Sequence, residues 1–369
     1  MDKPGLRYVF EHLKKADSFK NDWCRLERVS NASFFLSWQW ISNWVEVLKP
    51  ELHLCKVYFK EQLVGLGLFT SNDIKRHKIL AVKQIRLHST GNIEKDQLWP
   101  EYNGMLVETG YEESVYKGLI HFLEKQKDIV WEEFVLGPVK PAVSSLLTLS
   151  NTRPYVYWEA LTYQVDLQLL REKKLPYIES LSKNTRQQIR RSINHYKNQG
   201  KLVITRAQNE EQALDFFKHI APIHKQRWQK QSGFHNDTFV KFHQHLISNS
   251  FDSGAIEMIR LDVSGNVIGY LYNFIFNKKV YFYLSGIISA TENKLKPGLV
   301  LHAMCIQNHL EEGVELYDFL GGDAQYKKSL SNKVGSLNIT YYQKKSLKLQ
   351  FEQKARQIKN YLLPVERTN

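Results

Sequence analysis

The stretch LYDFLGGDAQYK, residues 316–327, decides the fold of the second half of the chain. Its first five residues are mostly apolar and predict a short buried strand, which ends at a Gly-Gly pair. Glycine at a strand end permits either a positive φ or the close approach of another molecule. Three reactive side chains follow directly: Asp323, Tyr326 and Lys327. Taken alone, the motif leaves an ordinary β-turn and a functional strand end equally open.

The composition predicts a folded protein that is not exported. The 369 residues are enough for two domains, and a hydrophobic content of 43% is that of globular chains. No apolar run reaches the roughly 18 residues of a membrane span, and the N-terminus has no apolar signal segment. Cys24, Cys55 and Cys305 are odd in number and far apart, which indicates free thiols in a reducing cytoplasm.

The positive charge is concentrated in the second half. Residues 1–160 hold 21 Lys and Arg against 20 Asp and Glu, whereas residues 161–369 hold 30 against 18. That second half is expected to attract anions such as a phosphorylated cofactor, a nucleic acid or an anionic surface. A solvated basic face without a partner is the other interpretation.

The two halves repeat one plan. Hairpins are predicted over 56–69 and 257–274, and each outgoing strand has a glycine at its third position, Gly65 and Gly269. A helix and a strand follow in each half, at about 112–127 and 133–138, and at about 299–312 and 317–322. The pattern predicts two α/β units of related design, joined by a crossover near residues 155–176. A helix over 38–49 capped by Ser37 precedes the first hairpin.

Residues 182–200, SKNTRQQIRRSINHYKNQG, predict a helix with a serine cap and a glycine stop. Ile189, Ile193 and Tyr196 form its apolar stripe. On the helical wheel four cations fall together on a neighbouring stripe, with Arg191 elsewhere: Lys183, Arg186, Arg190 and Lys197. Because aligned like charges repel, the stripe favours a polyanion contact over an idle solvated face.

A second candidate phosphate site is the loop Lys294-Leu-Lys-Pro-Gly298, which follows a strand at 280–284 and precedes a helix. The free N–H groups of a helix N-terminus and its positive dipole end attract phosphates. Lys294 and Lys296 add charge to this end. The loop lacks a complete glycine-rich fingerprint, and Pro-Gly also occurs in ordinary turns.

Five motifs together resemble the acetyltransferase-like domain of the CelD type, a branch of the GNAT superfamily related to the Fem-type transferases of peptidoglycan synthesis. They are SKNTR at 182–186, the hairpin, YFYLSG at 281–286, KLKPGLVLHAMCIQ at 294–307 and YDFLGGDAQYK at 317–327. The resemblance covers about residues 165–345, and more loosely 30–145. It implies tandem GNAT-like units, each a mixed and largely antiparallel sheet flanked by helices: residues 1–160, then an acyltransferase unit at 161–345. A basic amphipathic helix is expected at 346–369.

The resemblance implies transfer of an acyl group from acyl-CoA, with acetyl-CoA the expected donor, to an amine of a sugar, polysaccharide or cell-envelope precursor. The cofactor would lie between the fourth strand, 281–284, and the fifth, 316–320. The expected cofactor-binding residues are Leu284, Lys294, Lys296, Gly298, Arg186 and Arg190. The loop keeps only part of the GNAT pattern. Fem-type enzymes also lack that pattern and use aminoacyl-tRNA, so this donor is the alternative, and a non-catalytic RNA-binding module is a second.

Catalytic roles follow from what acyl transfer requires. Asp323 is the expected base, a backbone N–H of strand 281–284 would face the oxyanion, and Lys327 would assist it or bind phosphate. Tyr326 or Tyr283 would protonate the departing thiolate. The expected substrate-binding residues are Trp228, Tyr272 and Asp318; packing in the aromatic core is the other interpretation of the two aromatic residues. His243 and His245 have no further ligand at zinc spacing, so no metal is predicted. The protein is expected in the cytoplasm, and the basic tail could contact the inner face of an anionic membrane.

Overall fold

The computed structural model describes residues 5–13, 18–76, 80–126, 129–147, 152–290, 292 and 294–352. The chain divides into two compact units, the first formed by residues 1–160 with 336–369, and the second by residues 161–335. The second unit therefore ends ten residues before the predicted boundary at 345. Strand β13, Lys333–Lys344, passes from one unit to the other and pairs with a strand of the first.

In the first unit the sheet order is β1-β2-β3-β4-β6-β13, and β5 pairs with β3. All these pairs are antiparallel except β4 with β6. The strands are β1 Leu6–His12, β2 His53–Phe59, β3 Gln62–Arg76, β4 Leu80–Leu87, β5 Leu106–Val107 and β6 Glu133–Val139. The helices include α1 Lys20–Arg28, α2 Trp38–Leu48, α3 Glu112–Lys125 and the short α4 Pro141–Ser144. As predicted, Ser37 caps α2 by accepting a hydrogen bond from Trp40 N.

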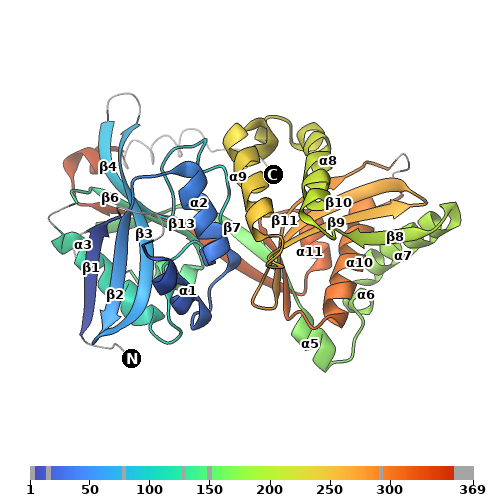
Figure 1. Cartoon of the computed structure of the whole chain (residues 1–369), viewed down its shortest axis with the longest axis horizontal. Coiled ribbons are helices and arrows are strands. Elements are labelled where there is room, and N and C mark those ends of the chain that lie inside the picture. Colours follow the sequence, from blue (N-terminus) through green and yellow to red (C-terminus); the bar gives the residue numbers. More distant parts are fainter. Residues whose placement is uncertain are drawn as a thin grey trace. The chain divides into compact units, whose positions relative to one another are not determined.

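In the second unit the sheet order is β7-β12-β11-β10-β9-β8, with β11 and β12 its parallel pair. The strands are β7 Thr152–Asp166, whose end lies in this unit, β8 Leu202–Arg206, β9 Ile256–Val263, β10 Asn266–Phe276, β11 Lys279–Ile287 and β12 Leu316–Gly321. The helices are α5 Leu167–Glu172, α6 Tyr177–Ser180, α7 Lys183–Gln199, α8 Glu210–Trp228, α9 Asp237–Ser250, α10 Pro297–Glu311 and α11 Gln325–Leu330. Helix α8 packs on β9, β10 and β11, and α9 packs on α8, whereas α10 packs against α5, α6, α7 and α11 (Figure 1). The predicted crossover near 155–176 thus contains a strand, β7, that pairs with β12.

The repeat predicted from the sequence is visible in the strand register. In the β2–β3 hairpin Val64 is an unpaired extra residue directly before Gly65. In the β9–β10 hairpin Ile268 is unpaired directly before Gly269. A Cβ on Gly269 would meet the carbonyl oxygen of Gly286 at 2.9 Å, so the neighbouring strand requires glycine there. Both units therefore combine a bulged hairpin with a parallel strand pair, and the predicted tandem α/β fold is confirmed.

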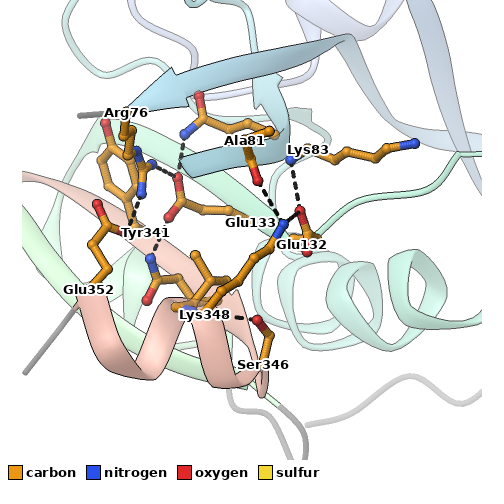
Figure 2. A network of polar contacts seen from close by, with 12 residues as sticks. Arg76, Ala81, Lys83, Glu132, Glu133, Tyr341, Ser346, Lys348 and Glu352 are labelled. Atoms are coloured by element: carbon orange, nitrogen blue, oxygen red, sulfur yellow. Dashed lines mark hydrogen bonds and ion pairs between the residues drawn. The ribbon is translucent and has the colours of Figure 1, made fainter. Parts of the chain in front are cut away.

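The segment that follows β13 is held to the first unit by a buried network of charges (Figure 2). Residues 347–352 are helical, and Glu352 lies 3.0 Å from Arg76, which also pairs with the fully buried Glu133. Gln343 donates to Glu133 at 2.6 Å, and Lys348 pairs with Glu132 at 2.7 Å. The described part of the predicted basic tail is thus anchored by ion pairs, and residues 353–369 lie outside the described residues. No helix in the described ranges is long and apolar enough to cross a bilayer.

Candidate functional site

The central strands of the second unit part from one another. β11 and β12 pair over only three residues, from Lys279 with Leu316 to Tyr281 with Asp318. Just beyond this point β11 contains a bulge, because Tyr272 pairs with Leu284 and Asn273 pairs with Phe282, which leaves Tyr283 as an extra residue. A bulge interrupts the regular ladder and redirects the strand. The rest of β11 therefore continues without β12 as a neighbour, and the predicted gap between the fourth and fifth strands of the unit is present.

A pocket of about 800 Å³ lies at the end of β11. It is bounded by the last residues of β11, the loop that follows, the start of α10, the end of α8 and one residue of α11. The lining residues are Ile223, Gln226, Arg227, Ser285, Ile287, Ile288, Ser289, Ala290, Glu292, Leu295, Lys296, Pro297, Gly298, Leu299, His302 and Tyr326. The volume is that of a small-molecule or cofactor site.

One side of this pocket is suited to an anion. The first backbone bond of α10 runs from Val300 N to Lys296 O, so the N–H groups of Gly298 and Leu299 precede the intrahelical ladder. Lys296, the residue directly before α10, adds an exposed cation to this side, and Arg227 is a second exposed cation of the pocket lining. Lys296 N donates to Ser192 Oγ at 3.1 Å, which ties the loop to α7. Free backbone N–H groups, the positive end of a helix dipole and a neighbouring cation are features that attract phosphates.

Another part of the pocket lining is uncharged and aromatic. The ring of Tyr326 stacks on the ring of His302, with centroids 5.6 Å apart and planes 22° apart. Burial raises the pKa of Tyr326 to about 12, although the charge of Arg227 acts against this rise. Tyr326 is therefore a protonated phenol at neutral pH and can donate a proton inside the pocket.

The end of β12, within residues 316–327, is a turn whose backbone conformation favours glycine. Gly322 has φ 111°, a conformation that side chains disfavour, and Lys327 Nζ donates to the carbonyl oxygen of Gly321. Asp323 is exposed and accepts a hydrogen bond of 2.9 Å from the buried Tyr163. Burial and this carboxylate raise the pKa of Tyr163, so its hydroxyl stays protonated and donates this hydrogen bond. The ammonium of Lys327 thus binds the strand end, and neither it nor Asp323 lines the pocket.

Asp318 is buried within β12 and holds a local distortion of the strand. Its carboxylate accepts from Leu320 N at 2.8 Å and from Gln164 Nε2 at 2.7 Å. Leu320 has a φ of 61°, at the register shift between β12 and β7. The structure therefore gives Asp318 a role in fixing the backbone, in place of the substrate contact expected from the sequence.

Tyr283 and Tyr272 belong to an aromatic cluster under α9. His243 connects them, with Nε2 3.0 Å from the Tyr283 hydroxyl and Nδ1 3.4 Å from the Tyr272 hydroxyl. Burial lowers the pKa of His243 and raises that of Tyr272, so both groups are uncharged. Tyr272 is fully buried and contributes to packing, in place of the expected pocket wall. Tyr283 is half-buried and does not line the pocket.

The basic helix α7 forms a separate groove of about 750 Å³. Its lining residues are Lys183, Arg186, Gln187, Arg190, Arg191, Asn194, His195 and Asn198. Arg191 thus shares the groove, and Lys197 is not among its lining residues, unlike the predicted stripe. Glu179 pairs with both Arg186 and Arg190, so two of the aligned cations have an acidic partner that the sequence analysis did not supply. These two arginines do not line the pocket at β11.

The remaining expected residues lie near the pocket without lining it. Lys294 is exposed, Leu284 is buried in β11, and Trp228 is 45% exposed beside Arg227. The sequence analysis did not single out Arg227, which is adjacent to Trp228, or His302. No sequence pattern marks Tyr163, because its contact with Asp323 depends on the pairing of β7 with β12.

Among the described residues, one buried group of possible metal ligands combines two residues of α10 with one of β9: Cys305, His309 and Glu257. Arg206 Nε lies 2.8 Å from Glu257, His309 Nε2 lies 3.0 Å from it, and Asn273 donates to it at 2.8 Å. Burial would raise the pKa of Glu257, but His309 and Arg206 hold it below its usual value. The carboxylate is therefore already compensated by protein donors, and the group needs no cation.

The fold of the chain is similar to that of known proteins with GNAT domains. Residues 183–328 match the family described as acetyltransferase (GNAT) domain. FemX is similar in structure, with 11% identity, a TM-score of 0.60, and coverage of 94% of this chain and 99% of that chain. The C-terminal domain of a putative lysylphosphatidylglycerol synthetase from Agrobacterium fabrum has 12% identity, a TM-score of 0.53, and coverage of 93% and 97%. No curated protein matches the chain.

The match over residues 183–328 agrees with the resemblance stated from the sequence. This segment contains α7, the pocket, and the strand end at 316–327. The structures of low identity show that the fold, including the tandem arrangement of the two units, is shared with FemX.

Proposed function

We propose that the protein transfers an acyl group from acyl-CoA, with acetyl-CoA as the expected donor, to the amine of a sugar, polysaccharide or cell-envelope precursor. The observation that carries this proposal is the composition of the β11 pocket. It combines a helix N-terminus and two cations, which suit a pyrophosphate, with a protonated tyrosine, which suits a departing thiolate.

The donor would bind along the free edge of β11. Its pyrophosphate would accept hydrogen bonds from the N–H groups of Gly298 and Leu299, with Lys296 and Arg227 balancing its charge. The acyl-bearing arm would extend toward Tyr326. The backbone of β11 next to the bulge at Tyr283 would donate to the oxyanion, because the bulge interrupts its regular pairing.

The acceptor would be activated at the strand end. Asp323 is exposed, and Tyr163 holds one of its oxygens. The lone pair of the neutral acceptor amine would form a bond to the thioester carbon, and the other carboxylate oxygen of Asp323 would take the proton that the nitrogen releases as this bond forms. As the tetrahedral intermediate collapses, the carbon–sulfur bond breaks and the Tyr326 hydroxyl gives its proton to the thiolate. Lys327 would keep the turn at Gly321 in place.

The α7 groove supports a second candidate, an aminoacyl-tRNA donor. Four cationic side chains and one histidine line this groove, beside three amides that can bind phosphate oxygens. This donor would use α7 and would not need the cationic side of the β11 pocket. A third reading, an RNA-binding module without catalysis, would use the same groove. In each case the protein would act in the cytoplasm, where these donors are made, or at the inner membrane face.

Binding experiments with matched variants separate these candidates. CoA and acetyl-CoA are expected to raise the melting temperature of the protein, and Lys296→Ala to reduce this rise. Arg190→Ala, in the α7 groove, and Lys241→Ala, on the exposed face of α9, should keep it. Release of thiol from acetyl-CoA with an aminosugar acceptor would then establish the reaction. If CoA has no effect, and tRNA binds with a steep salt dependence that Arg190→Ala weakens, the acyl-CoA proposal is refuted.

A further inference from the structure

His302 lies at the second turn of α10, on the wall of the β11 pocket. Its side chain is almost completely buried between aromatic rings. Tyr326 stacks on one face, and Phe282 meets the ring edge-on with centroids 4.5 Å apart. Phe319 packs at 5.2 Å. These contacts fix the plane of the imidazole ring.

The hydrogen bond of His302 determines which of its nitrogens carries the proton. Nδ1 lies 3.2 Å from the hydroxyl of Tyr317, a residue that is fully buried. A buried O–H must find an acceptor, and an imidazole nitrogen is a better one than the nearby thiol of Cys305. Tyr317 therefore donates to Nδ1. In a neutral imidazole the proton then resides on Nε2, which has no hydrogen-bond partner among the described residues.

The charges around His302 keep the ring neutral. Burial lowers its pKa to about 3, and the cations Lys327 and Arg227 act in the same direction. The other groups packed against it are the uncharged phenols of Tyr317 and Tyr326 and the rings of Phe282 and Phe319. At neutral pH His302 is therefore an N–H donor without charge.

We propose that His302 presents its Nε2–H to the pocket as a fixed neutral donor, which binds a carbonyl oxygen on the acyl-bearing arm of the donor substrate. The inference rests on the acyl-CoA function proposed above and adds a specificity residue to it. From Gly298 to His302 the helix rises about 6 Å. The cationic side would thus take the phosphates, and His302 would take an uncharged amide or thioester carbonyl farther along the pocket.

A neutral donor suits this place better than a cation would. An imidazolium or lysine would attract a second phosphate group and would be costly to bury among four aromatic rings. A neutral N–H instead recognises carbonyl oxygen, of which the arm of CoA has several. The same ring holds Tyr326 by stacking, so the donor arm and the proposed acid would be positioned by one side chain.

The test uses the full-length protein labelled with ¹⁵N-histidine. The resonances that disappear in His302→Phe identify His302, because phenylalanine keeps the ring stack and removes both nitrogens. We expect the Nε2–H tautomer, no titration between pH 5.5 and 8, and a shift of the Nε2–H proton when CoA is added. In Tyr317→Phe the Nδ1–H tautomer should become populated. An Nδ1–H tautomer or an imidazolium in the unmodified protein would overturn the inference.

Binding of CoA gives the second readout. His302→Phe should weaken CoA binding about three- to tenfold, as expected for one lost hydrogen bond, with an unchanged fold by circular dichroism. The control is His219→Phe on the exposed face of α8, which should bind as the unmodified protein does. If His302→Phe binds CoA equally well, the role of His302 is refuted and the proposed donor stands. If the unmodified protein binds no CoA, acyl-CoA is refuted as the donor. The proposed contact of His302 with a carbonyl of that donor is then refuted as well.

Discussion

The substitution Arg76→Met is expected to loosen the first unit strongly. Arg76 pairs with Glu133, whose side chain is fully buried, and with Glu352, whose side chain is 4% exposed. Methionine keeps much of the apolar length and removes the charge. Glu133 would retain the amide donors Gln84 and Gln343 but would lose its cation. Breaking a buried ion pair typically costs 3–5 kcal/mol, and because the arginine is 15% exposed we expect about 3 kcal/mol.

Native-state hydrogen exchange measures this cost within one unit. About 3 kcal/mol corresponds to a rise of roughly 150-fold in the opening equilibrium of the elements that the network connects. Backbone amides of β4, β6 and β13 should therefore exchange faster by about that factor. Amides of β9 and β10, in the second unit, should be unchanged, because distant sites act independently.

Two further variants make the result decisive. Arg7→Met removes a pair that is largely exposed, with an N–O distance of 3.8 Å to Glu61, and should alter exchange by no more than about twofold. Adding Glu133→Gln to Arg76→Met removes the uncompensated carboxylate and should restore most of the protection. If Arg76→Met behaves like Arg7→Met, the network does not stabilise the unit and the reasoning is wrong.

Three other predictions concern the second unit. Tyr326→Phe should lower acyl-CoA turnover about 10²- to 10⁴-fold and leave CoA affinity nearly unchanged. In the unmodified enzyme the pKa of Tyr326 is about 12, so activity should not fall through loss of this proton below about pH 10. Equal turnover of the variant and the unmodified enzyme would exclude Tyr326 as the acid. Gly322 has a φ of 111°, so Gly322→Ala should destabilise the unit by about 1–2 kcal/mol in urea unfolding. Gly298→Ala is the control, because a Cβ there would meet no atom closer than 3.7 Å and should not destabilise the unit. Similar losses for the two variants would show that the backbone conformation at Gly322 does not require glycine. The pKa of Glu257 is lower in the folded protein than its usual value of 4.5, so its contribution to the free energy of unfolding is present above pH 4.5 and is lost as the pH falls through the folded-state pKa. Glu257→Gln should abolish this loss of stability in acid. An unchanged profile of stability against pH would show that Glu257 is not its source.

Local features of the fold could be read from the sequence because local chemistry fixes them. Ser182 caps α7 and Ser37 caps α2, and each accepts a hydrogen bond from the backbone N–H three residues later. A hydroxyl at this position satisfies a donor that the helix leaves free. The glycines of the hairpins were recognised for a similar reason, since a strand that approaches closely excludes a Cβ.

The candidate site could be predicted only in part. Lys296, Gly298 and Tyr326 were singled out because they follow a strand or precede a helix, and they line the pocket. Tyr272 and Asp318 were singled out by residue type, but the structure buries both. An aromatic or acidic residue on a strand carries no sequence mark that separates a ligand contact from a core contact, because neighbouring elements decide what covers it.

The sequence by itself determined the order of the elements, the helix caps, the hairpins and the strand end at residues 316–327, all of which depend on residues close together in the chain. Only the tertiary structure decided which side chains share the pocket. Arg227 comes from α8, His302 from α10 and Tyr326 from α11; α8 and α10 pack on the sheet, and α11 packs on α10. It also decided that Glu179 compensates two arginines of α7. Such contacts follow from how the elements pack on one another, which short-range sequence patterns do not encode.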